Sequence, residues 1–401
     1  MVSVLLLTAG TNLQGVLLPI RRQLEGSSMQ DVGLLSSGWS FGFVVACLVV
    51  GRLISSVGHV RSFAALAAVS GATSLLLLPL NEEVTWIVLR IVIGFCFGGL
   101  SLIIESWLNE RSGNHQRGAI FAVYMTVSLV ASLAGTLSLA FLDPQDTLPY
   151  TLMGIAVVLS IVPVALTRAP LPKPIEPFSI QLRLLYRISP TGVFGCFAVG
   201  VVSGALGGLL PAYGLSMGLS THAVATLLAM ALVGGALAYY PVGALSDRVD
   251  RRVVIITLAC LSAALCALIV LRPHLPPFGL LLAIGAFGFC QYPLYGVCVA
   301  ITNDRVREQS FSEVASELLI VYGTGTVLGP PLAAAMMHYG ERFLFLFMGA
   351  VLMLLAGFTV ARMQQTPRTP RELKVRSHPL GTAPNSMQRF RPRRDHEKAD
   401  I

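Results

Sequence analysis

Residues 243–252 read Gly-Ala-Leu-Ser-Asp-Arg-Val-Asp-Arg-Arg and lie between two long apolar segments. Half of these residues are charged, although charged residues make up only 12% of the 401-residue chain. A weaker copy lies at residues 51–61, where Ser55 stands at the position that Asp247 holds in the later copy. Two related loops far apart in one chain indicate two homologous halves.

The composition is that of an integral membrane protein. Hydrophobic residues make up 54% of the chain, and the mean hydropathy is +0.73, whereas soluble domains are roughly 45–50% apolar and about 25% charged. Because about 20 apolar residues cross a bilayer, we predict an all-α membrane protein with twelve transmembrane helices in two pseudo-symmetric six-helix bundles. The expected spans are residues 1–20, 31–54, 61–80, 84–107, 117–141, 148–167, 189–214, 221–245, 253–271, 277–301, 312–338 and 343–361.

The spans divide the chain into four parts. We expect an N-terminal bundle at 1–167, a cytoplasmic linker at 168–188 with a short amphipathic helix near its end, a C-terminal bundle at 189–362 and a tail at 363–401. Residues 362–401 contain ten basic and four acidic residues and supply most of the net charge of +8. This proline-rich tail lacks apolar periodicity, so we expect it to be disordered and to bind anionic lipid headgroups rather than nucleic acid.

The distribution of positive charge predicts the orientation. The loops on one side of the spans carry thirteen Lys and Arg residues before the tail, and the loops on the other side carry only four. Lys and Arg crowd the cytoplasmic loops of membrane proteins. We therefore expect both termini and both charged loops to be cytoplasmic, in the inner membrane of a bacterium.

Polar side chains inside the first-half spans are candidates for a substrate cavity. Asn12 and Gln14 lie in an otherwise apolar span, and uncharged amides in lipid usually face a neighbouring helix or a cavity. We expect the Asn12 side chain either to contact the substrate or to form an interhelical hydrogen bond. An arginine inside a membrane span carries a high free-energy cost, so Arg90 is expected to have a function. Alternatively, its side chain could snorkel to the outer interface. Tyr124 in the fifth span completes this set.

The second half adds three candidates. Gln291 and Tyr292 lie near the middle of the tenth span, beside Pro293, and Tyr322 lies in the eleventh. Tyr usually occurs at membrane interfaces, so a tyrosine in mid-span predicts cavity lining or core packing.

Glu105, at the end of the fourth span, has two interpretations. It lies about 22 Å along the helix from Arg90, so the two cannot pair directly. Arg52, Arg61 or Arg117 could form a structural ion pair with it. A buried carboxylate whose partner can move is also a reasonable proton carrier.

The charged loop resembles the signature loop of the major facilitator superfamily, G-x-L-x-D-R-x-G-R-R, from which it departs only at Asp250. Further stretches resemble the bacterial YcaD-like branch of that family, namely residues 104–106, 117–125, 241–252, 292–293 and 322–330. The resemblance implies two bundles that rock about a central site and give alternating access.

The resemblance also implies a conformational latch. Asp247 is expected to face the N-terminus of the fifth span across the two halves, a contact worth roughly 0.3–1 kcal/mol when exposed and about 2 when partly buried. The expected latch and its neighbouring charge cluster comprise Gly243, Asp247, Arg248, Arg251, Arg252, Glu105 and Arg117.

The predicted function is secondary active transport of a small organic solute by a monomer, with proton coupling and uniport both open. The alternative is a non-transporting membrane sensor or scaffold that acts through its basic tail. No HExxH, GxSxG or P-loop motif is present, and the seven cysteines show no CxxC spacing. We therefore expect no enzyme activity, no cofactor and no metal site.

Overall fold

The computed structural model describes residues 1–80, 82–111, 117–166, 181–272, 275–306 and 311–365. The expected tail and most of the expected linker lie outside these ranges. All the regular structure of the described residues is helical. The helices are α1 (Val2–Leu24), α2 (Met29–Val57), α3 (His59–Leu76), α4 (Glu83–Arg111), α5 (Arg117–Ser138), α6 (Leu148–Leu159), α7 (Ile161–Ala165), α8 (Leu182–Ile188), α9 (Pro190–Ser216), α10 (Thr221–Arg248), α11 (Arg251–Leu271), α12 (Pro277–Asn303), α13 (Phe311–Met337) and α14 (Phe343–Gln365).

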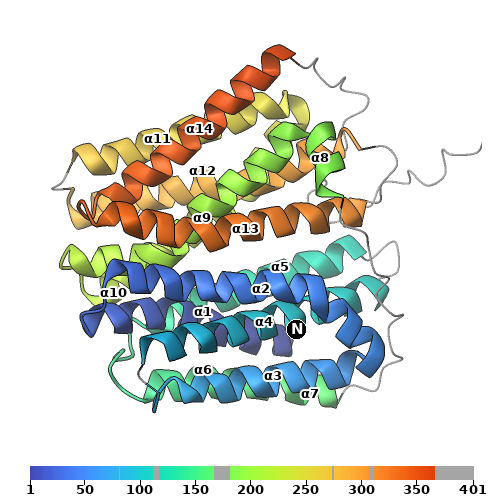
Figure 1. Cartoon of the computed structure of the whole chain (residues 1–401), viewed down its shortest axis with the longest axis vertical. Helices are drawn as coiled ribbons and strands as arrows, with labels where there is room; N and C mark the ends of the chain where they lie inside the picture. Colours follow the sequence, from blue (N-terminus) through green and yellow to red (C-terminus); the bar gives the residue numbers. More distant parts are fainter. Residues whose placement is uncertain (81, 112–116, 167–180, 273–274, 307–310, 366–401) are drawn as a thin grey trace, which may run out of the picture.

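The helices form two groups, α1–α7 and α9–α14, which we call the first and second halves (Figure 1). Helices α6 and α7 form one span, Leu148–Ala165, which is interrupted at Ser160. Pro163 lies one turn after Leu159 and has no backbone N–H to donate, which favours a break at this point. The short helix α8 lies where a helix was expected near the end of the linker. The Gln181 N–H just before it donates to Glu317 Oε1 of α13 at 2.9 Å.

The structure confirms an all-α membrane fold. Within the described ranges, ten helical segments are long and apolar enough to cross a membrane. Helices α3 and α5 lie beside them in the first half but are not among the ten. The expected number of twelve spans is therefore not fully confirmed.

The same close helix crossing occurs in each half. In the first half, a Cβ on Gly42 of α2 would overlap the Ile91 carbonyl oxygen of α4, and a Cβ on Gly94 of α4 would overlap the Trp39 carbonyl oxygen of α2. In the second half, Gly234 of α10 meets Gly285 of α12 in the same way, and Gly288 of α12 meets Ala231 of α10. Small residues allow membrane helices to approach this closely. The repetition is structural evidence for two related halves.

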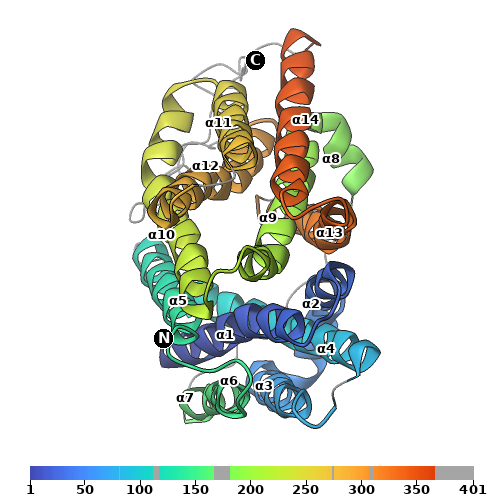
Figure 2. The same ribbon diagram turned by 90° about the vertical axis from the view of Figure 1, so that its left-hand side faces the viewer.

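The two halves meet where α2 lies beside α13 and α5 beside α10 (Figure 2), and where α9 packs on α1 and α2. We call the end where α10 finishes and α11 begins the signature end, and the other the opposite end. Ser37 Oγ donates to the Val327 carbonyl oxygen at 2.6 Å, and Val224 near the start of α10 packs in a first-half core cluster. These contacts lie between mid-helix and the opposite end, so the halves are joined there.

We predict that Gly94→Ala will lower the stability of the detergent-purified protein by about 1–3 kcal/mol, because the new methyl group must displace a backbone carbonyl. The control is Gly296→Ala in α12, where a Cβ would meet nothing within 4 Å. The measurement is the thermal unfolding midpoint of both variants. Equal midpoints would show that the α2–α4 crossing relaxes freely and would contradict the prediction.

Candidate functional site

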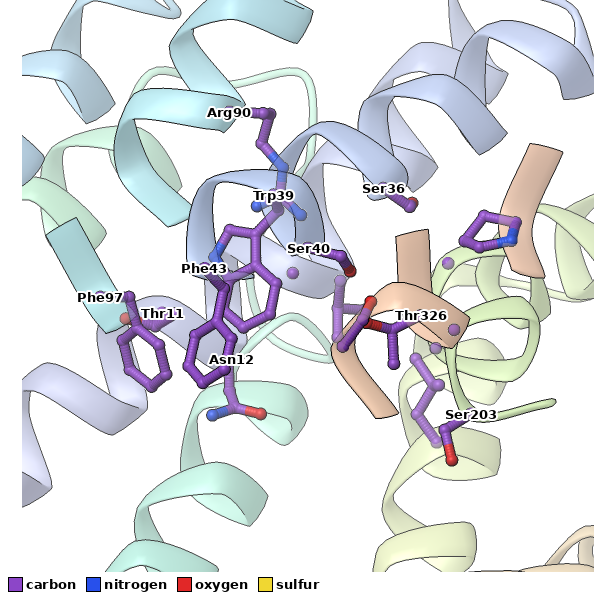
Figure 3. A pocket seen from close by; sticks show the side chains of 18 of the residues that line it. Thr11, Asn12, Ser36, Trp39, Ser40, Phe43, Arg90, Phe97, Ser203 and Thr326 are labelled. Carbon is purple, nitrogen blue, oxygen red and sulfur yellow. The ribbon is translucent and has the colours of Figure 1, made fainter. Parts of the chain in front are cut away.

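A cavity of about 480 Å³ lies between the two halves. Helices α1, α2, α4 and α5 of the first half and α9, α10, α12 and α13 of the second half all contribute to its wall. Figure 3 shows side chains from both halves turned toward this space. Its volume lies within the range of about 300–1,000 Å³ that is typical of small-molecule sites.

Arg90 reaches the cavity from α4 (Figure 3). Its side chain is 5% exposed, and its Nη1 donates to Gln14 Oε1 at 3.2 Å. Its Nε is buried without a hydrogen-bond partner, and no carboxylate of the described residues pairs with the guanidinium. Placing an arginine at the centre of a spanning helix costs about 2.5–3.5 kcal/mol on insertion scales. Arg90 does not snorkel to the outer interface, and its buried charge has no protein counter-ion in this part of the chain.

Gln14 lies behind Arg90 rather than in the cavity wall. It is buried, and its Nε2 donates to Ser74 Oγ at 3.2 Å. Ser74 Oγ in turn donates to the Ser70 carbonyl oxygen at 2.8 Å. This chain of hydrogen bonds holds the Gln14 amide oxygen toward Arg90.

Three aromatic side chains form one wall of the cavity. The Trp39 ring lies 5.7 Å from Phe43 and 5.5 Å from Phe97, and the rings of Phe43 and Phe97 are 6.4 Å apart, all measured between centroids. Such spacings are typical of favourable aromatic pairs. The indole Nε1 of Trp39 is buried without a partner among the described residues.

Three further predicted residues line the same cavity: Asn12, Tyr292 and Tyr322. Asn12 Nδ2 donates to the Thr8 carbonyl oxygen of its own helix at 2.9 Å. The Tyr322 ring lies 4.8 Å from that of Tyr295. The structure thus brings α1, α12 and α13 together at one site.

Two other candidates lie away from the cavity wall. Gln291 is fully buried within the second half, where its Nε2 donates to the Val199 carbonyl oxygen at 3.4 Å. Tyr124 belongs to the core of the first half. Both positions are those of packing residues in this conformation.

Glu105 occupies the signature-end part of α4. It is exposed, and its charge acts on Cys47 of α2, Tyr124 of α5 and Tyr295 of α12. Since Tyr295 belongs to the second half, the Glu105 carboxylate lies within electrostatic range of that half. No ion pair joins it to Arg52 or Arg61 in the described part of the chain, and the Arg117 side chain lies outside that part.

The signature loop is organised around Arg251, which is 1% exposed. Its Nε lies 2.8 Å from Asp304 Oδ2, and its Nη2 lies 3.2 Å from Asp247 Oδ1 and 3.4 Å from Asp304 Oδ1. Its Nη1 also donates to Ser246 Oγ at 3.1 Å. Asp247 therefore contacts its own half in this conformation, and its contact with α5 stays a prediction.

The remaining loop residues have separate environments. Asp250 caps α11 by accepting from the Arg252 N–H at 3.0 Å, and Arg252 Nε lies 3.3 Å from the same carboxylate. Arg248 is exposed at the last turn of α10, where a cation is favourable. A Cβ on Gly243 would meet nothing within 4 Å. Just past α12, burial and the charge of Arg252 lower the pKa of Arg305.

Sequence reasoning missed Asp304 and the aromatic wall. Trp39 and Phe43 are four residues apart and so share one helix face, a signal that was available in the sequence. Nothing in the sequence connects Phe97 with them, or Asp304 with Arg251. Over the described ranges, no group of three His, Cys, Asp or Glu side chains could hold a metal ion.

We predict that Asp304→Asn will destabilise the protein by about 3 kcal/mol, because it removes the main counter-ion of a buried arginine. The matched control is Asp146→Asn, at an exposed carboxylate that makes no ion pair among the described residues, and it should change stability little. Thermal unfolding in detergent measures both, with an expected fall in midpoint of roughly 5 °C or more for Asp304→Asn. A midpoint equal to that of the control would mean that Arg251 does not need this partner.

Solved structures of transporters have the same fold. A bacterial homologue of the human lysosomal transporter Spinster, described as inward-facing and occupied, aligns with a TM-score of 0.74 at 13% identity over 94% of this chain and 98% of its own. A D-xylose–proton symporter aligns with a TM-score of 0.73 at 14% identity over 92% and 97%. The nucleoside transporter NupG aligns with a TM-score of 0.72 at 12% identity over 90% and 96%.

Curated sequences give a closer relationship. The chain is 28% identical over 352 residues to the uncharacterized MFS-type transporter YcaD of Escherichia fergusonii, covering 86% of this chain and 90% of the relative. It is 29% identical over 361 residues to an uncharacterized MFS-type transporter of Enterobacter sp. strain 638, with the same coverage. The sequence profile of the Major Facilitator Superfamily matches residues 1–234 and 192–394. The chain therefore belongs to the major facilitator superfamily and is similar to its YcaD-type transporters.

Proposed function

We propose that the protein is a secondary transporter that carries one small organic solute at a time through the cavity between its halves. The observation that carries this proposal is the cavity itself, because its wall is shared by both halves and the halves are joined at one end of it. A site between two bodies can be exposed to either side by rocking one body against the other. This rocking of the two halves is the only conformational change that the proposed transport requires.

The orientation follows from charge. The signature end carries most of the Lys and Arg residues, so we place it in the cytoplasm with both termini, in a bacterial inner membrane. The contacts between the halves then lie on the outer side, and the conformation is inward-open. The similarity to a transporter solved in an inward-facing state supports this assignment. The protein acts as a monomer, with its basic tail on anionic headgroups.

Proton coupling is assigned to Glu105. Its carboxylate is exposed, lies within electrostatic range of the second half and has no ion-pair partner among the described residues. Closing the signature end would remove water from around this charge, which is costly unless the carboxylate takes up a proton. Protonation of Glu105 therefore favours closure of the signature end and opening of the opposite end.

We predict two exchanging conformations. The separation of the halves at the signature end can be measured by double electron–electron resonance between two spin labels. The labels are placed at Ser56→Cys in α2 and at the exposed Leu245→Cys in α10, in a chain that also carries Cys47→Ser and Cys260→Ser. Two distance populations are expected. A short thiol crosslinker between Ser37→Cys and Val327→Cys should leave only the longer distance, because it holds the opposite end closed.

The control is the same labelled pair in a chain that ends at residue 365. It should keep both populations, since the tail is not part of the rocking bodies. One unchanging distance with and without the crosslinker would describe a rigid scaffold and would refute the transport proposal.

We predict that lowering the pH from about 8 to about 5, toward carboxyl titration, will shift these populations toward the shorter signature-end distance. Glu105→Gln should remove most of this shift and hold the shorter distance at both pH values, because glutamine resembles the protonated acid. Glu82→Gln, at an exposed carboxylate near the opposite end, is the matched control and should respond like the wild type. An unaltered pH response in Glu105→Gln would exclude this residue as the coupling site.

A further inference from the structure

Among the described residues, the cavity wall carries a positive charge and no negative one. Arg90 is the only Arg, Lys, Asp or Glu side chain among the described lining residues, and the other polar lining side chains are one amide, an indole and several hydroxyls. A buried cation without a counter-ion is costly in a membrane protein. A ligand that brings one negative charge would neutralise it, whereas a cationic ligand would add to the repulsion.

Among the described residues that line the cavity, the buried side-chain atoms without a hydrogen-bond partner are all donors. Arg90 Nε and Trp39 Nε1 are both donors, and both are buried without partners. The only hydrogen bond that the Arg90 guanidinium makes to a described residue is to Gln14. A guanidinium has five donors in a planar fork that matches a carboxylate. These two buried donors lack acceptors, which a bound carboxylate would supply.

Gln14 acts as a positioning residue for this fork. The Gln14 amide is oriented by its hydrogen bond to Ser74, so that its oxygen accepts from Arg90 Nη1. The remaining N–H groups of the guanidinium are then available to a ligand. The rings of Trp39, Phe43 and Phe97 form an apolar wall of the same cavity. An apolar or aromatic body packed on this wall would gain favourable contact area.

We infer that the transported solute is an organic monocarboxylate with a compact apolar body, bound with its carboxylate at Arg90 and its body against Trp39, Phe43 and Phe97. This inference rests on the proposed transport function and names its substrate class. One carboxylate matches the single arginine, because a dianion would leave a net charge in an apolar cavity. The cavity of about 480 Å³ holds one such molecule.

The test measures binding to the detergent-purified full-length chain. The probes are benzoate, phenylacetate and hexanoate, each compared with its neutral amide, and benzylammonium as the cation. The readouts are the thermal unfolding midpoint and the quenching of tryptophan fluorescence, with Trp39→Phe identifying the part of the signal that comes from the site. At least one carboxylate should bind the wild type more tightly than its amide, and benzylammonium should not bind.

Arg90→Gln should weaken carboxylate binding about tenfold or more, since a charge-assisted pair is lost. Arg90→Lys should retain more affinity than Arg90→Gln because it keeps the charge. Arg342→Gln, at an exposed arginine outside this cavity, should bind like the wild type. Ligand-free Arg90→Gln should unfold at a higher temperature than the wild type, because an unpaired buried charge is gone; this also shows that the variant is folded.

Three results would overturn the inference: no carboxylate binds, the amides bind as tightly as the acids, or Arg90→Gln leaves carboxylate affinity unchanged. The spin-label experiment keeps this failure separate from that of the proposed function. Two exchanging populations without carboxylate binding would leave transport standing with another substrate. Carboxylate binding through Arg90 with one fixed distance would leave the anion site standing without transport.

Discussion

The structure depends on close backbone packing between the helices of each half. Gly42 and Gly94 in the first half, and Gly234 and Gly288 in the second, lie where a side chain would overlap a facing carbonyl oxygen. Lipid gives helices no hydrophobic reason to associate, so such contacts are a principal source of their stability. Each half is therefore packed as a rigid body. The joint between the halves is made near one end, where Ser37 contacts Val327, and the proposed rocking would pivot there.

Ion pairing among the described residues distinguishes Arg251, inside the second half, from Arg90 and Glu105. Arg251 is buried within the second half and is met by two carboxylates and a hydroxyl. Arg90 lines the cavity between the halves, Glu105 is exposed within electrostatic range of both halves, and neither has an ion-pair partner among the described residues. A paired buried charge stabilises one arrangement, whereas an unpaired one makes the arrangement sensitive to what binds it. The unpaired charges are therefore the points at which a solute or a proton can act on the conformation.

The sequence predicted those features that depend on one segment at a time. Apolar runs revealed the spans, and Arg90 stood out because an arginine inside a span is rare and costly. Features that join distant segments were predicted less well. Gln291 and Tyr124 were chosen for their polarity in mid-span, but periodicity alone does not say which face of a helix meets a cavity. The pairing of Arg251 with Asp304 and the contact of Phe97 with Trp39 arise only when separate helices pack together.

The positions of Arg90 and Glu105 on one helix constrain any coupling between solute and proton. They are fifteen residues apart in α4, which is about 22 Å along the axis. At that distance, with part of the path lined by protein and part by water, their direct Coulomb interaction is weak. In the proposed mechanism, a ligand at Arg90 and a proton at Glu105 influence one another through the position of the second half. Coupling of this kind requires only that each binding event has a different affinity in the two arrangements.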